Sequence, residues 1–153
     1  MRKFIISIDA GTTSNRSILF DLKGKPIYYS QKEFTQYFPK SGWVEHNPDE
    51  IWRTTVQTLK AVIQKAKSLK GKILSIGITN QRETTVLWDK KTGKAVYRAI
   101  VWQDRRTEEF CKKLRKQNKD TMIFNKTGLL IDSYFSGTKI KWILDNVSKA
   151  KQL

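Results

Sequence analysis

The stretch that decides the fold lies near the start of the chain, where residues 4–16 read FIISIDAGTTSNR. An apolar run ends at Asp9 and is followed by a glycine and a series of hydroxyl side chains, which predicts a strand over residues 3–9 that leads into a tight turn. Further strands are predicted on the C-terminal side of this stretch, over 16–22 and 26–34, and the Lys-Gly-Lys between them is typical of a hairpin. The turn therefore lies between the first two strands of a meander.

The residues of this turn suit a phosphate group. Gly11 allows close approach of the backbone to an anion, and consecutive N–H groups in a turn can form an anion-binding concavity. Arg16 can donate to phosphate oxygens, and Asp9 is an oxygen ligand suited to Mg²⁺. The hydroxyl donors are Thr12, Thr13 and Ser14. The Gly-Lys-Ser/Thr ending of a Walker loop is absent, and an ordinary hairpin turn of the same composition is the alternative.

A helix is predicted from Pro48 to about Ser68. Asn47 is a suitable N-cap, Pro48 suits the first helical position, and Glu50 completes a capping box. The face expected to pack inward comprises Ile51, Thr55, Leu59, Val62, Ile63 and Ala66. The next segment, residues 72–79 (KILSIGIT), is continuously apolar and predicts a strand that is covered on both faces.

The second half of the chain predicts a further strand pair and then helices. The strands are expected over 85–89 and 95–102, joined by the turn KKTGK. Helices are expected over 107–117 and about 119–126, the second ended by Gly128 as its C-cap.

Ser136 is predicted to cap a last helix, which would bury one apolar face. That face comprises Ile140, Ile143, Leu144 and Val147. The order of strands and helices along the whole chain predicts an α/β fold, a mixed sheet covered by helices.

Polar side chains follow strand 72–79 directly, at the end of a sheet where ligands of open α/β folds bind. Arg82 and Glu83 offer donors and acceptors together, as a small polyol requires. Trp102 and Tyr134 could cover the carbon chain of a polyol and bond one of its hydroxyls. The alternatives are an exposed ion pair for Arg82 and Glu83 and core packing for the two aromatic residues.

The composition of the 153 residues fits one globular domain, with 29% charged side chains and a net charge of +16. The Lys residues are spread along the chain without an interleaved pattern of Arg and aromatic residues, which favours a solvated surface over nucleic-acid binding. No apolar run reaches the roughly 20 residues of a membrane helix, so no membrane partner is expected. The single Cys111 favours a reducing cytoplasm, and His46 is predicted to make a structural hydrogen bond.

Several stretches together resemble the N-terminal part of the glycerol kinases, a branch of the FGGY carbohydrate kinases. They are DAGTTSNRS, SGWVEHNPDEIW, IGITNQRETTVLWD, AIVWQDRRT and TGLLIDSYFSGTKIKWILDN, in the same order and over nearly the whole chain. The first is shared with other sugar kinases and the actin-like ATPase fold, whereas GITNQRETT, WQDRRT and DSYFSGTK separate the glycerol kinases from the pentulose kinases. Position 10 departs from the pattern, with Ala where many members carry Gln.

The resemblance implies a ribonuclease H-like domain of the actin-like ATPase fold, with ATP and Mg²⁺ as cofactors and glycerol as the phosphate acceptor. It implies nucleotide contacts for four residues, Thr12, Thr13, Ser14 and Arg16, and a position near the metal for Asp9. It also implies a glycerol pocket formed by Arg82, Glu83, Trp102 and Tyr134.

The members of that family are several times longer than 153 residues, and their catalytic Asp and second domain lie beyond the position of Leu153. Residues 1–153 are therefore expected to be the N-terminal part of the first kinase domain, without the second domain and poorly active alone. A separately encoded C-terminal kinase part is a predicted partner. The alternatives are a non-catalytic remnant that binds ligand weakly and a basic nucleic-acid-binding module.

Overall fold

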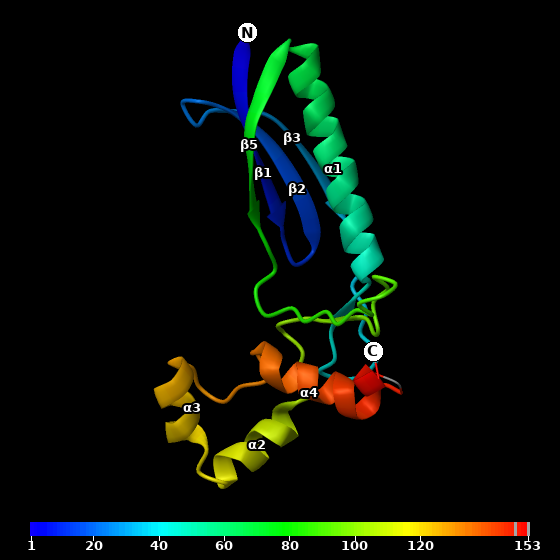
Figure 1. The fold of residues 1–153 in the computed structure, drawn as a ribbon, viewed down its shortest axis with the longest axis vertical. Coiled ribbons are helices and arrows are strands. Elements are labelled where there is room, and N and C mark those ends of the chain that lie inside the picture. The colour runs from blue at the N-terminus through cyan, green and yellow to red at the C-terminus, as the bar shows by residue number, and fades with distance from the viewer. Residues whose placement is uncertain (149, 153) are drawn as a thin grey trace. The chain divides into compact units, whose positions relative to one another are not determined.

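Figure 1 shows the computed structural model of the chain, which describes residues 1–148 and 150–152. The chain divides into two units. Unit 1 comprises Met1–Thr35 and Asp49–Gln81, and unit 2 comprises Gln36–Pro48 and the described residues from Arg82 onward. Each unit contains one of the two groups of site residues that the sequence predicts.

Unit 1 is built on a four-stranded sheet in the order β3-β2-β1-β5 (Figure 1). Its strands are β1 (Arg2–Ala10), β2 (Ser14–Asp21), β3 (Pro26–Glu33) and β5 (Gly71–Thr79). The first three are antiparallel neighbours, and β5 runs parallel to β1. The predicted meander is confirmed, with the Gly11 turn between β1 and β2.

Helix α1 (Pro48–Ser68) packs on this sheet and closes the core of unit 1. The buried cluster consists of Phe4, Ile6, Ile8 and Leu19 from the sheet and Val62 and Ala66 from the helix. The predicted helix face is partly wrong, because Thr54 and Thr58 are buried where Ile51 and Thr55 were expected. The two threonines are buried because they bond polar groups of β2. Asn15 Nδ2 donates to Thr54 Oγ1 at 2.7 Å, and the Ser17 and Thr58 hydroxyls are 3.0 Å apart.

The prediction that residues 72–79 are covered on both faces is also wrong. Strand β5 is an edge strand of the sheet, and its apolar side chains are exposed, Leu74 by 47%, Ile76 by 47% and Ile78 by 73%. The apolar run therefore forms a strand with an open backbone edge and an uncovered apolar surface.

Unit 2 contains two short strands, β4 (Glu45–His46) and β6 (Ala99–Ile100), which pair antiparallel. The predicted strand pair over 85–89 and 95–102 is wrong in extent. Only isolated bridges join Thr85 to Ile100 and Trp88 to Ala95. The two bridges do not share one register, so the ladder between these segments is interrupted. Asp89 lies in the turn that joins them, where its carboxylate accepts the Lys91 N–H at 2.8 Å and the Thr92 hydroxyl at 2.6 Å.

The helices of unit 2 are α2 (Glu108–Lys116), α3 (Asp120–Thr127) and α4 (Ser136–Asn146), followed by the 3₁₀ helix η1 (Ala150–Gln152). Gly128 is the left-handed C-cap of α3 with φ 71°, as predicted. Ser136 is not a cap, because it is the first helical residue and donates its hydroxyl to Glu83. On α4 the predicted inward residue Ile140 is 39% exposed, and Lys139 is buried instead.

Among the described residues, no helix is both long and apolar enough to cross a membrane.

Candidate functional site

The turn between β1 and β2 brings together the predicted nucleotide residues of unit 1. Gly11 N donates to the carbonyl oxygen of Ser14 at 3.0 Å, which closes the turn. A Cβ at position 11 would lie 2.9 Å from that oxygen, so the turn requires glycine. The amide of Gln31 on β3 donates to the Ser14 hydroxyl at 2.9 Å, which fixes one of the hydroxyls that follow Gly11.

Asp9 and Arg16 face each other across the β1–β2 ladder, just beside the turn. Arg16 Nη2 lies 3.3 Å from Asp9 Oδ2, and the two side chains are 44% and 40% exposed. In the part of the chain that the structure describes, no cluster of three or more acidic, His or Cys residues could hold a metal. One partly exposed carboxylate fits a role toward Mg²⁺, which proteins often hold through one or two carboxylates together with phosphate oxygens.

The predicted polyol residues lie in unit 2, and two of them share a cavity. The rings of Trp102 and Tyr134 meet edge to face with centroids 5.8 Å apart. Both line an open cavity of about 960 Å³ together with Arg105, Leu130, Asp132 and Phe135. Among the described residues, neither Arg82 nor Glu83 is part of that lining. Arg82 is exposed.

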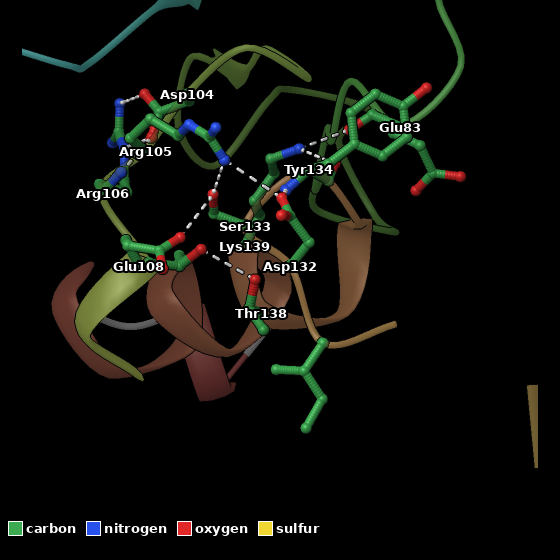
Figure 2. A network of polar contacts seen from close by, with 12 residues as sticks. Glu83, Asp104, Arg105, Arg106, Glu108, Asp132, Ser133, Tyr134, Thr138 and Lys139 are labelled. Atoms are coloured by element: carbon green, nitrogen blue, oxygen red, sulfur yellow. Dashed lines mark hydrogen bonds and ion pairs between the residues drawn. The ribbon is translucent and has the colours of Figure 1, made fainter. Parts of the chain in front are cut away.

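Glu83 is bound to the same region through its side chain and through its backbone, and Figure 2 shows the backbone contact with Lys139. Its Oε2 accepts the Ser136 backbone N–H at 3.0 Å and the Ser136 hydroxyl at 2.9 Å. The carboxylate thus lies at the N-terminus of α4, where the helix dipole favours a negative charge. Glu83 also has φ 63°, a left-handed conformation that is costly for a residue other than glycine. A strained residue held by several bonds is typical of functional sites.

Lys139 on α4 joins Glu83 to Tyr134. Its side chain is completely buried, and its Nζ donates to the backbone oxygen of Glu83 at 3.0 Å and to that of Tyr134. Burial lowers the pKa of Lys139 to about 8, although the nearby carboxylates of Asp104, Glu83 and Asp132 favour the charged form. Sequence reasoning missed this residue because a lysine between apolar helix positions is usually read as a solvated side chain.

The loop that carries Tyr134 is fixed by a second set of bonds (Figure 2). Arg105 Nη1 donates to Asp132 Oδ1 at 3.2 Å and to the Ser133 hydroxyl at 3.0 Å. Asp132 Oδ1 also accepts the Tyr134 N–H at 2.7 Å, and Ser133 in turn bonds Glu108 of α2 at 3.3 Å. The backbone of Tyr134 is therefore held from both Asp132 and Lys139.

Arg106, next in sequence to Arg105, is a fully buried guanidinium that sequence reasoning did not single out. It donates to Asp104 through Nε at 2.9 Å and Nη2 at 2.8 Å, and its Nη2 also bonds Glu45 at 2.8 Å. The guanidinium carbon lies 3.8 Å from the ring centroid of Trp43 and 4.6 Å from that of Trp142. This cluster joins the start of α2 to β4 and α4, and so supports the segment that carries Trp102.

Comparison with known proteins agrees with the fold, which is that of a carbohydrate kinase domain. The model of the N-terminal domain of the FGGY family of carbohydrate kinases matches residues 4–152. The chain therefore belongs to the FGGY family, and its fold is the ribonuclease H-like, actin-like ATPase type.

Within that family, glycerol kinases are among the relatives with high identity. The glycerol kinase of Oceanobacillus iheyensis is 58% identical over 150 residues, which are 98% of this chain and 30% of that protein. The glycerol kinase of Bacillus cereus strain AH187 is 55% identical over 152 residues, which are 99% of this chain and 31% of that protein. The chain thus spans about 30% of the length of the curated relatives it matches.

Solved structures give the same result. Plasmodium falciparum glycerol kinase with ADP superimposes with a TM-score of 0.92 at 36% identity, covering 99% of this chain and 30% of that chain. A ligand-bound xylulose kinase from Lactobacillus acidophilus has a TM-score of 0.89 at 22% identity, covering 98% of this chain and 30% of that one. The second likeness is evidence of the shared fold only.

Proposed function

We propose that this chain is the N-terminal part of a glycerol kinase, which transfers the γ-phosphate of ATP to glycerol and yields sn-glycerol 3-phosphate and ADP. The observation that carries the proposal is the 55–58% identity to glycerol kinases over nearly the whole chain. We infer a cytoplasmic location, because the reaction consumes ATP.

Glycerol is proposed to bind in unit 2, between the Trp102–Tyr134 pair and the segment of Arg82 and Glu83. Trp102 offers an apolar face to the carbon chain, and the Tyr134 hydroxyl can donate to or accept from a glycerol hydroxyl. Glu83 Oε2 already accepts two bonds from Ser136, which leaves Oε1 to accept a glycerol hydroxyl. The exposed Arg82 guanidinium supplies donors to the same ligand.

The β1–β2 turn of unit 1 is proposed to hold the phosphates of ATP. Hydroxyls and backbone N–H groups of Thr12, Thr13 and Ser14 would donate to phosphate oxygens, and Arg16 would donate to ADP. Asp9 would hold Mg²⁺, which neutralises the charge on the transferring phosphate when bound. Parting the half-exposed Asp9–Arg16 pair costs little, because exposed pairs contribute about 0–1 kcal/mol.

The group that accepts the proton of the glycerol hydroxyl is proposed to lie outside these residues, in a C-terminal kinase part. Such a base contributes about 10²–10⁴-fold to a rate. We therefore expect the 153 residues alone to bind glycerol weakly and to turn over poorly.

Complementation tests this proposal. The chain is mixed with, or fused to, the part of the Oceanobacillus iheyensis glycerol kinase that lies outside the matched 30%, and ADP release is measured with and without glycerol. We expect glycerol-dependent ADP release from the combination, and little from either part alone. A combination that binds glycerol without turnover would favour a non-catalytic remnant, and one that neither binds nor reacts would refute the proposal.

The pocket is tested by Glu83→Gln in the active combination. We expect the KM for glycerol to rise by about tenfold or more with the KM for ATP unchanged, because Glu83 is proposed to contact glycerol and not ATP. Glu109→Gln is the matched control, since that side chain is 80% exposed and pairs only with Lys112 in the described contacts. An unchanged glycerol dependence would remove Glu83 from the pocket.

A further inference from the structure

The buried ammonium of Lys139 is not explained by packing. A charged amine taken out of water loses hydration and must be compensated by hydrogen bonds and nearby charges. Within the described part of the chain, its hydrogen bonds go to the backbone oxygens of Glu83 and Tyr134, two residues in other segments, rather than to a carboxylate (Figure 2). The bonds join the two segments on which Glu83 and Tyr134 are carried.

The conformation of Glu83 depends on those bonds. With φ 63° its backbone is in the left-handed region, where a non-glycine residue pays about 1–2 kcal/mol. The Lys139 bond holds its carbonyl group, and the Ser136 bonds hold its carboxylate. Without the ammonium, the backbone oxygen of Glu83 would keep only the longer bond from the Thr85 hydroxyl at 3.5 Å, beside the Ser136 bonds to its carboxylate.

We propose that Lys139 is a positioning residue of the polyol pocket: its ammonium ties the backbone of Glu83 to that of Tyr134 and sets the spacing of their side chains. This inference rests on the proposed function, because it takes glycerol as the ligand. Lys139 itself would not touch glycerol. It acts by holding two ligand-binding residues in place, and small misplacements of such groups are costly to binding and catalysis.

The burial and the charges around Lys139 make its hydrogen bonds to Glu83 and Tyr134 sensitive to pH. The carboxylates of Asp104, Glu83 and Asp132 favour the ammonium, and the guanidinium of Arg106 opposes it. Burial is the larger effect and lowers the pKa of Lys139 to about 8. Above that pH the amine is neutral, and its bonds lose the charge assistance that roughly doubles their strength. The backbone groups of Glu83 and Tyr134 should therefore both respond to the titration of Lys139.

Nuclear magnetic resonance on the ¹⁵N-labelled chain tests this between pH 6.5 and 9.5. The amides of Thr84 and Phe135 follow the two carbonyls that accept from Lys139, so we expect both signals to shift with one midpoint near pH 8. Both shifts should vanish in Lys139→Met. Lys141→Met is the matched control, because Lys141 lies on the same helix, is 49% exposed and pairs with Asp145.

Glycerol is then titrated at pH 6.5 into the wild-type chain and each variant, with the Trp102 indole signal as the readout. We expect about tenfold weaker binding in Lys139→Met and unchanged binding in Lys141→Met. Separate midpoints for Thr84 and Phe135, shifts that persist in Lys139→Met, or equal glycerol affinity in that variant would overturn the inference. If Thr84 and Phe135 share one midpoint but the wild-type chain shows no response to glycerol, the proposed ligand would be refuted while the link from Lys139 to both backbones would be supported.

Discussion

Replacing Arg106 with Met should destabilise the chain by about 4 kcal/mol. The guanidinium is 0% exposed and bonds Asp104, which is also 0% exposed, and Glu45, which is 3% exposed. Removing one partner of a buried ion pair typically costs about 3–5 kcal/mol, because the remaining charge is left without compensation. The cation–π contacts with Trp43 and Trp142 add about 0.5–2 kcal/mol each, and the retained packing of the Met side chain offsets part of the loss.

The adjacent Arg105 provides a matched control for this substitution. Arg105 pairs with Asp132 at 3.2 Å, but its side chain is 60% exposed, so Arg105→Met should cost less than about 1 kcal/mol. The free energy of unfolding is measured by urea denaturation with tryptophan fluorescence. A domain of this size has about 5–15 kcal/mol of stability, so the loss stays measurable.

A second substitution separates charge pairing from packing. Asp104→Asn in the Arg106→Met background removes the orphaned charge while keeping the shape, and we expect it to recover part of the stability. If Arg106→Met costs no more than Arg105→Met, or if Asp104→Asn deepens the loss, the reasoning from buried charge is wrong.

Three other perturbations test different parts of the fold. Gly71→Ala should cost about 1–3 kcal/mol in thermal unfolding, because its Cβ would lie 2.1 Å from the ring of Phe4, whereas Gly77→Ala has nothing within 4 Å and should be tolerated. Lys139 has a pKa of about 8 in the folded chain against an ordinary value of 10.5. The unfolded chain therefore keeps a proton that the folded chain has lost, and this residue makes stability rise by about 1.4 kcal/mol per pH unit between these values. The free energy of unfolding is measured by urea denaturation at pH 8 and pH 10 for the wild type and for Lys139→Met. The difference between the two proteins should grow with pH at that slope, and a difference that does not change with pH would contradict the lowered pKa. The exposed apolar edge strand β5 predicts self-association of the isolated chain in sedimentation velocity. Ile78→Lys should reduce it, because it places a charge on that strand, and unchanged association would exclude β5 as the contact.

The sequence predicted the strands of unit 1 and the helices of unit 2 well, because strong local signals determine them. The Lys-Gly-Lys hairpin and the Gly128 C-cap require a left-handed backbone that few residues adopt, and the Gly11 turn has no room for a Cβ. The extent of the 85–102 strand pair was mispredicted, because the bridges of Thr85 to Ile100 and of Trp88 to Ala95 do not share one register, which the local sequence pattern does not indicate.

The predicted site residues could be named from the sequence, but the residues that hold them could not. Hydrophobic periodicity assigns charged side chains to the surface, so it gave no signal for the buried Lys139 and Arg106. It also assigned Thr54 and Thr58 to the wrong side of α1, because their burial depends on polar partners in β2 that are 39 and 41 positions away in the sequence. Such partners are known only once the chain is folded.

Those two threonine contacts also limit how helix α1 can lie along the sheet. Sliding the helix by one turn, about 5.4 Å, would bring Val62 opposite Ser17 in place of Thr58 and leave a buried hydroxyl without its partner, at about 1–3 kcal/mol. An interface of apolar side chains alone would accept such a displacement at smaller cost. The paired hydroxyl and amide groups therefore select one longitudinal position for α1, and they fix the distance between the helix and the Gly11 turn that Asn15 closely follows.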